Sequence, residues 1–122
     1  MRWIVDGMNV IGSRPTGWWR DRPGAMRELV AELDAFAARG GEEVTVVFDG
    51  GPFDVEGESV EVRFASRRGP NAADDDIAAL VERDAEPGEL SVVTSDGDLA
   101  RRARDAGAAV VGAGEFCRLL DG

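Results

Sequence analysis

The amino-acid sequence predicts an α/β fold, a three-layer sandwich in which a mostly parallel central sheet of about five strands lies between two layers of helices. Short apolar segments of strand length alternate along the chain with segments that repeat apolar residues at helical spacing. Several strand segments are apolar without interruption, which is typical of parallel strands covered on both faces. With 122 residues, 43% of them hydrophobic, the chain is predicted to form a single domain over residues 1–122.

The first half of the chain supplies three strands and one long helix. RWIVD (2–6) and EVTVVFDG (43–50) are predicted buried strands, and SVEVRFA (59–65) alternates apolar and polar residues as a half-buried or edge strand does. The segment 23–39 is a predicted helix because its apolar residues follow a 3, 4 spacing, a proline stands near its first turn and a Gly-Gly pair ends it. Loops are predicted at 12–22 and 51–58.

The second half alternates helix and strand. DDDIAALVERD (74–84) is a predicted helix, LSVVTSD (90–96) a buried strand and GDLARRARDAG (97–107) a second helix. A strand, AAVVGA (108–113), and a short helix, GEFCRLL, follow. Cys117 occupies a packing position of that last helix, so we expect a structural thiol rather than a nucleophile.

The composition excludes several classes of site. The chain has no histidine and no lysine, which rules out Ser-His-Asp systems, zinc sites of the Cys/His type and P-loop lysine chemistry. Its 24 acidic and 14 basic residues give a net charge of −10, unlike a general nucleic-acid coat protein. No apolar run is long enough to span a bilayer and no signal-peptide pattern is present, so a cytoplasmic protein is expected.

Four aspartates stand where predicted parallel strands end or where a helix begins. Asp6, Asp49 and Asp96 each close a predicted buried strand, and Asp74 stands at a helix start. Because the carboxyl ends of parallel strands lie at one edge of a sheet, these carboxylates are expected to meet in one cleft. Each alone would be interpreted as a turn or helix-start residue. The prediction depends on all three buried strands ending in aspartate.

Carboxylates held this close raise one another's pKa, and a hard divalent cation is the usual compensation. With only oxygen ligands available, Mg²⁺ or Mn²⁺ is the expected cofactor. Such ions can hold a phosphodiester, lower the pKa of an attacking water and neutralise a leaving oxygen.

Polar residues beside these aspartates each have two interpretations. Asn9 either orients a carboxylate, a water or a phosphate through its amide, or caps a turn. Ser95, like its neighbour Thr94, either adds a hydroxyl to the site or caps the next helix. Asp98 is either a further ligand at the site or a first-turn charge favoured by the helix dipole.

The row Asp74, Asp75 and Asp76 begins the helix at 74–84, where successive residues lie about 100° apart. Asp74 is expected on the side of the sheet edge. Asp75 is expected in solvent, and is the alternate site residue, while Asp76 falls on the flank. Asn71 is expected to cap this helix, with Asp74 completing a capping box.

Arginines near the expected cleft could bind phosphate, and indoles can stack on bases. The pair Trp18 and Trp19, among the arginines of the first loop, suggests single-stranded RNA as a ligand, although either ring could instead cover the core. The expected substrate-binding residues are Asn9, Ser95, Arg14, Arg67 and Arg68. Three further arginines are expected on a solvated helix face: Arg101, Arg102 and Arg104.

Five segments occur in an order and spacing that resemble those of a known family. They are VDGMNVIG, VVFDG, VRFA, NAADDDI and VVTSDGDL, and the resemblance that they carry covers nearly the whole chain. The sequence resembles the NYN domain in its YacP-like branch, part of the PIN-like nuclease superfamily. The resemblance implies a Rossmann-like (PIN-like) sheet and a metal-dependent endoribonuclease with Mg²⁺ or Mn²⁺ in an acidic pocket. The matching positions are Asp6, Asn9, Asp49, Asp74 and Asp96, and Asp98 matches a further acid of related nucleases.

The expected function is therefore hydrolysis of RNA phosphodiesters. Asp6, Asp74 and Asp96, with Asp98, are the expected metal ligands. Asp49 is expected to assist, and Asn9 to position water or substrate. Family members often continue with a basic helical extension, whereas this sequence stops at Gly122 and carries a net charge of −10. A protein or ribonucleoprotein partner that delivers the RNA is therefore a second expectation.

Three other classes of protein share parts of this pattern. A response-regulator receiver needs a lysine at the end of its last strand, and a Toprim-like domain needs a glutamate after its first, where Asp6 stands. The remaining alternative is a non-catalytic PIN-like module that binds RNA or protein.

Overall fold

A computed structural model describes residues 1–50, 52, 54–69 and 71–121 of the chain. Its strands are β1 Arg2–Asp6, β2 Glu43–Phe48, β3 Val60–Phe64, β4 Leu90–Val93 and β5 Ala109–Val111. Its helices are α1 Gly7–Gly12, α2 Arg22–Gly40, α3 Ala72–Arg83, α4 Gly97–Asp105 and α5 Ala113–Asp121, with short 3-10 helices η1 Trp18–Arg20 and η2 Pro87–Glu89. Two positions of the predicted 51–58 loop, Gly51 and Phe53, lie outside the described residues.

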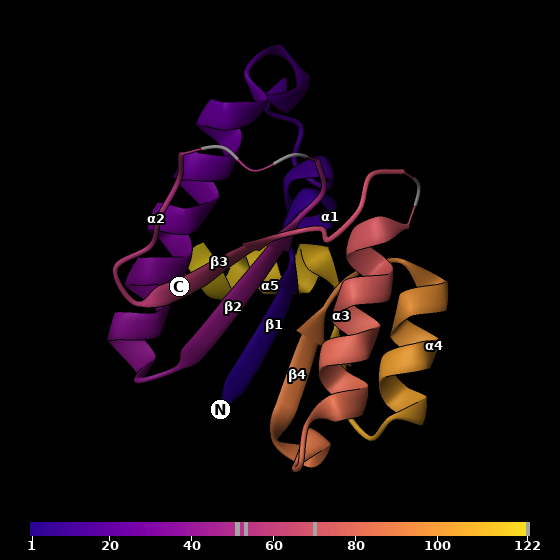
Figure 1. Ribbon diagram of the computed structural model, residues 1–122. Coiled ribbons are helices and arrows are strands. Elements are labelled where there is room, and N and C mark those ends of the chain that lie inside the picture. The colour runs from indigo at the N-terminus through magenta and orange to yellow at the C-terminus, as the bar shows by residue number, and fades with distance from the viewer. Residues whose placement is uncertain (51, 53, 70, 122) are drawn as a thin grey trace.

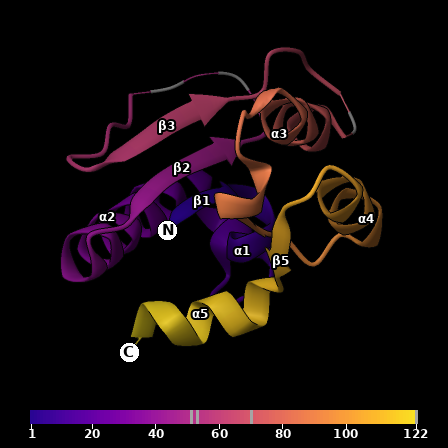
Figure 2. The ribbon, with the colours of Figure 1, turned by 90° about the horizontal axis from the view of Figure 1, so that it is seen from below.

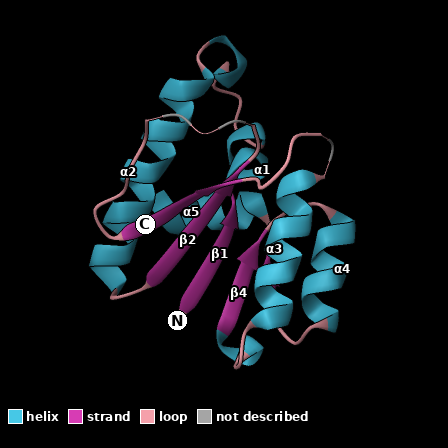
Figure 3. Cartoon of the chain, viewed as in Figure 1, coloured by secondary structure: helices cyan, strands magenta, loops and turns pink. Residues whose placement is uncertain are grey.

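The five strands form one sheet in the order β3-β2-β1-β4-β5, and all four neighbouring pairs are parallel. The strand arrows therefore run in one direction (Figure 3). The order reverses on either side of β1, and in such sheets ligands bind beyond the carboxyl ends at this switch point. The predicted α/β fold is confirmed, with a sheet that is parallel throughout.

Helices cover both faces of the sheet, as the three-layer prediction requires. Figure 2 shows α2 and α5 on one side and α3 and α4 on the other. Alternate residues of β1 face the two layers, since Trp3 and Val5 belong to the α2 and α5 core cluster whereas Ile4 belongs to the α3 and α4 cluster. The sheet is thereby held from both sides, and its carboxyl edge is left as a rigid base for a site.

The sequence did not predict α1, which directly follows Asp6. The six-residue helix buries Val10 and Ile11 against the α2 side of the core, and this packing outweighs the poor helix propensity of its terminal glycines. The loop predicted at 12–22 is correspondingly shorter and contains the 3-10 turn η1.

The predicted cap of α3 is wrong. Asn71 precedes the helix with a left-handed backbone (φ 62°), and its side chain makes no capping hydrogen bond. The helix begins at Ala72, two residues before the predicted start, so Asp74 lies within its first turn. Among the described residues, no helix is long and apolar enough to cross a membrane.

Candidate active site

A polar pocket of about 270 Å³ opens at the carboxyl edge of the sheet. Its walls come from the end of β1, from α1, from the segments after β2 and β4, and from the start of α3. The residues that line it are Asp6, Met8, Asn9, Asp49, Asn71, Asp74 and Asp96. The structure therefore brings together the four aspartates and the asparagine that the sequence placed in one cleft.

Asp6 is the most deeply set of these side chains. It ends β1 and is only 4% exposed, and its Oδ2 accepts a hydrogen bond from the Thr94 hydroxyl at 3.0 Å. Burial, together with repulsion from Asp74 and Asp49, raises the pKa of Asp6 to about 7, although the Thr94 hydrogen bond opposes the rise. Keeping Asp6 ionised in this pocket is therefore unfavourable unless positive charge enters.

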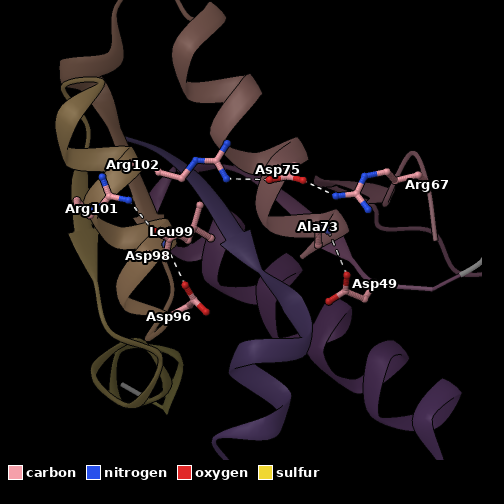
Figure 4. A network of polar contacts seen from close by, with 9 residues as sticks. All are labelled: Asp49, Arg67, Ala73, Asp75, Asp96, Asp98, Leu99, Arg101 and Arg102. Carbon is pink, nitrogen blue, oxygen red and sulfur yellow. Dashed lines mark hydrogen bonds and ion pairs between the residues drawn. The ribbon is translucent and has the colours of Figure 1, made fainter. Parts of the chain in front are cut away.

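Asp74 and Asp49 face this carboxylate from α3 and from the end of β2. Burial raises the pKa of Asp74, and the charges of Asp96 and Asp49 raise it as well. Asp49 accepts a hydrogen bond from the backbone N–H of Ala73 at 3.2 Å, which ties the end of β2 to the first turn of α3 (Figure 4). An N–H at a helix start is a favourable partner for an anion.

Asp96 and Asn9 are held by hydrogen bonds from the segment after β4. Asp96 caps α4, since its Oδ1 accepts from the Leu99 N–H at 2.9 Å, and its own N–H donates to Thr94 Oγ1 at 3.1 Å. The Asn9 Oδ1 accepts from the Ser95 N–H at 2.8 Å. The Thr94 hydroxyl thus links Asp6 to Asp96, in agreement with the first of its two interpretations, that it adds a hydroxyl to the site. The Ser95 hydroxyl instead accepts from the Ala113 N–H at 2.9 Å.

Asp98 lies apart from these residues. Its side chain is 70% exposed and pairs with Arg101 at 2.7 Å, and it is not among the residues that line the pocket. Asp96 and Asp98 flank the start of α4 two residues apart, so their side chains leave the helix in different directions.

Asp75 and Asp76 make contacts away from the pocket. Asp75 does not line it, as expected, but two arginines bind its carboxylate: Arg67 from the loop before α3 and Arg102 from α4, the latter at 2.8 Å (Figure 4). The expectation that Arg102 lies on a purely solvated face is wrong, because α3 and α4 pack side by side. Asp76 accepts from the Ser66 N–H at 2.6 Å and from its hydroxyl at 2.8 Å.

The expected substrate-binding arginines have different environments. Arg14 forms two hydrogen bonds with Glu32 of α2, at 2.8 and 2.7 Å, and does not line the pocket. Arg67 is paired with Asp75, whereas Arg68 is exposed in the same loop. Of the two indoles, Trp18 is half-buried against the core and Trp19 is 62% exposed.

Two residues that line the pocket were not predicted to do so. Met8 carries no chemical signal for a site, and Asn71 was interpreted as a helix cap. Asn71 has a left-handed backbone. Asparagine adopts this conformation more easily than most residues, so an asparagine directly before the helix could have indicated a left-handed turn there.

The donor set of the pocket fits a hard divalent cation, because every polar side chain that lines it ends in oxygen or a neutral amide. Within residues 1–50, 52, 54–69 and 71–121, no group of three or more His, Cys, Asp or Glu side chains is arranged to hold a metal ion. Mg²⁺ is usually bound through one or two carboxylates with several retained waters, so its binding does not require three carboxylates at ligand distance.

A larger cavity of about 420 Å³ lies at the opposite, amino edge of the sheet, beside Arg2, Glu43 and Leu90. Each of these residues begins a strand, and none of the pocket aspartates reaches this cavity. The carboxylates that the sequence predicted to form a site lie at the other edge.

Comparisons with known proteins agree with this fold. Residues 3–122 match the YacP-like NYN domain family. Two crystal structures of Rae1 (YacP) from Bacillus subtilis, one of a point mutant, are similar to the chain. The mutant superposes with a TM-score of 0.83 at 26% identity, over 98% of this chain and 74% of that one. The other superposes with a TM-score of 0.82 at 25% identity, over 99% of this chain and 74% of that one.

The search of curated proteins gives no match. The family match nevertheless extends over nearly the whole chain, and the structural similarity covers the same residues. The chain therefore belongs to the YacP-like NYN domain family, a family of nuclease-type domains.

Proposed function

We propose that the protein is a metal-dependent endoribonuclease that hydrolyses RNA phosphodiester bonds in the pocket at the carboxyl edge of its sheet. The observation that carries the proposal is the convergence of Asp6, Asp49, Asp74 and Asp96 with Asn9 in one pocket, from four separate stretches of the chain. The nuclease-type family supports the same chemistry.

Among Asp6, Asp74 and Asp96, one or two carboxylates would bind Mg²⁺ or Mn²⁺ directly, and the others would bind it through retained waters. When bound, the cation supplies positive charge to the phosphodiester and lowers the pKa of water at the site. Asp49 keeps the first turn of α3, and with it Asp74, against the end of β2 through its bond to the Ala73 N–H. Asp98 pairs with Arg101 instead and is left out of the proposed ligand set.

Asn9 is suited to position the substrate. Its Oδ1 accepts from the Ser95 N–H, so the orientation of the amide is set and its Nδ2 group is the end that can donate. In the described part of the chain, Nδ2 has no hydrogen-bond acceptor. A non-bridging phosphate oxygen is the acceptor that the proposal assigns to it.

The decisive test compares cleavage of single-stranded RNA by the wild type and by Asp6→Asn, with Mg²⁺, with Mn²⁺ and with EDTA. We expect cleavage by the wild type with either metal, none with EDTA, and a loss of at least about a hundredfold in Asp6→Asn. Equal rates for both proteins would contradict the proposal. A wild type that binds RNA but cleaves no sequence under any condition would favour a non-catalytic binding module.

A further inference from the structure

The segment between α1 and α2 carries an exposed indole that the proposed cleavage does not use. Trp19 is 62% exposed, and in the described part of the chain the other large exposed apolar side chains are Met1 and Leu119. A single exposed apolar residue needs no explanation by itself. The surroundings of Trp19 are what distinguish it.

Trp19 is held in place by its neighbour. Gly17 takes a left-handed conformation (φ 69°) that starts the turn η1, and Trp18 packs half-buried against the core. The two indoles meet edge to face, with ring centroids 6.0 Å apart, so the fixed ring of Trp18 supports the exposed ring of Trp19. The exposed indole is thus presented on a supported turn rather than on a loose loop.

Two arginines accompany the indoles. The Arg20 guanidinium carbon lies 6.0 Å from the centre of the Trp19 ring, and that of Arg22 lies 5.8 Å from the Trp18 ring. Both arginines are exposed, and neither pairs with a carboxylate of the described residues, whereas Arg14, Arg67 and Arg102 each do. In a chain of net charge −10, the Trp–Arg turn (residues 17–22) carries two arginines against one carboxylate, Asp21, and is therefore locally cationic and aromatic.

The Trp–Arg turn lies at the same end of the molecule as the pocket. It follows α1, which itself starts from Asp6 and contributes Asn9 to the pocket wall. Figure 1 shows this segment projecting beyond the carboxyl ends of the strands, at the top of the view. An RNA strand that enters the pocket can extend along the molecule to reach it.

We propose that the Trp–Arg turn binds a single-stranded segment of the RNA substrate, with one base stacked on Trp19 and the adjoining phosphates contacted by Arg20 and Arg22. This inference rests on the proposed function. Stacking accepts every base because each has a π-face, and arginine adds phosphate contacts. Bases of a duplex are already stacked on each other, so single strands are the form recognised.

The test measures binding of a fluorescein-labelled 12-nucleotide single-stranded RNA by anisotropy, with EDTA present so that the RNA stays intact. Trp19→Ala is expected to raise Kd about tenfold, and Trp19→Phe to retain most of the affinity. Leu119→Ala, which also removes an exposed apolar side chain but lies on α5, is the matched control and should leave Kd unchanged. A hairpin duplex of the same composition should bind all four proteins equally.

The arginines are tested through the salt dependence of the same binding. Arg20→Gln and Arg22→Gln should each reduce the slope of log Kd against log salt by about 0.7, the value for one phosphate contact on a single strand. Arg104→Gln, at an exposed arginine of α4, should leave the slope unchanged. In the presence of Mg²⁺, Trp19→Ala should raise KM for cleavage without lowering kcat.

The outcomes separate this inference from the proposed function. If the wild type cleaves RNA and Trp19→Ala changes neither Kd nor KM, the Trp–Arg turn does not bind RNA and the proposed function stands. If no RNA is cleaved but Trp19→Ala still weakens single-strand binding, the turn is an RNA platform and the catalytic proposal fails. If Trp19→Ala lost as much affinity for the hairpin as for the single strand, the stacking account would be overturned. It would also be overturned if RNA did not bind and a protein bound at Trp19 instead.

Discussion

At the residue scale, the buried carboxylate of Asp6 lowers the free energy of unfolding when it is ionised. A carboxylate that is 4% exposed and faces two further carboxylates is costly to ionise, and burial raises its pKa to about 7. The raised pKa means that the folded protein binds a proton more tightly at Asp6 than the unfolded chain does. Between the unfolded value of 3.8 and about 7, the free energy of unfolding contributed by this group falls as the pH rises.

This linkage predicts a gain of stability on removing the charge. In EDTA at pH 8, Asp6→Asn should raise the free energy of unfolding by about 1–4 kcal/mol, because the variant no longer buries an ionised carboxylate. At pH 4 the wild-type carboxyl is protonated in the folded state, and the difference should be small. Urea unfolding at both pH values measures it. If Asp6→Asn were less stable than the wild type at pH 8, the ionised Asp6 carboxylate would not be destabilising the fold, and the prediction would be wrong.

The residue types of the site were predictable from the sequence, but their partners were not. Asp6, Asp49, Asp74 and Asp96 were identified because strand ends converge in a parallel sheet. The contacts of Arg14 with Glu32 and of Arg102 with Asp75 depend on how separate helices pack, and no local pattern reports that. The exposure of Asp98 could have been predicted, because Asp96 and Asp98 lie two residues apart at the start of α4 and therefore on different sides of that helix.

At the element scale, α1 is the part of the fold that the sequence did not predict. Its six residues include glycine at both ends, so local propensity argues against a helix, and burial of Val10 and Ile11 outweighs it. Strand positions were confirmed within a few residues, because continuous apolar runs bounded by turns identify buried parallel strands. The predicted Asn71 cap is wrong because Asn71 takes a left-handed conformation and its side chain makes no capping hydrogen bond.

The two glycines of α1 provide a matched test of its packing. A Cβ on Gly7 would lie 2.5 Å from the Phe48 ring, which is fully buried, whereas a Cβ on Gly12 meets nothing within 4 Å. Gly7→Ala should therefore lower the free energy of unfolding by about 1–3 kcal/mol. Gly12→Ala should leave it unchanged or raise it by up to about 1 kcal/mol. Denaturant unfolding of both variants measures the difference, and equal effects would mean that α1 does not pack closely on β2.

At the scale of the whole molecule, the strand order β3-β2-β1-β4-β5 explains why the site lies where it does. Asp6 ends the strand at which the order reverses, and Asp49 and Asp96 follow its two neighbours. Two layers of helices bury the faces of the sheet and leave its carboxyl edge to polar groups. The alternation of strands and helices predicted a parallel sheet, but it does not encode the strand order.

The acidic pocket predicts that divalent metal stabilises the whole fold. A ligand that binds only the folded state raises the free energy of unfolding by about 2.7 kcal/mol at a hundred times its Kd. Mn²⁺ should therefore raise the thermal midpoint of the wild type by several degrees over NaCl of equal ionic strength. Asp74→Asn should lose much of this rise. A midpoint that does not respond to Mn²⁺ or Mg²⁺ would favour a metal-independent binding module.

The measurement that tests the central claim most directly is RNA cleavage with Mn²⁺ by two variants of α3, Asp74→Asn and Asp76→Asn, whose positions lie two residues apart. Asp74 lines the pocket, whereas Asp76 bonds to Ser66 outside it, so the two changes remove the same charge from the same helix. We predict that Asp74→Asn loses nearly all activity and that Asp76→Asn stays within about threefold of the wild type. Full activity in Asp74→Asn, or loss in Asp76→Asn alone, would contradict the assignment of the catalytic pocket.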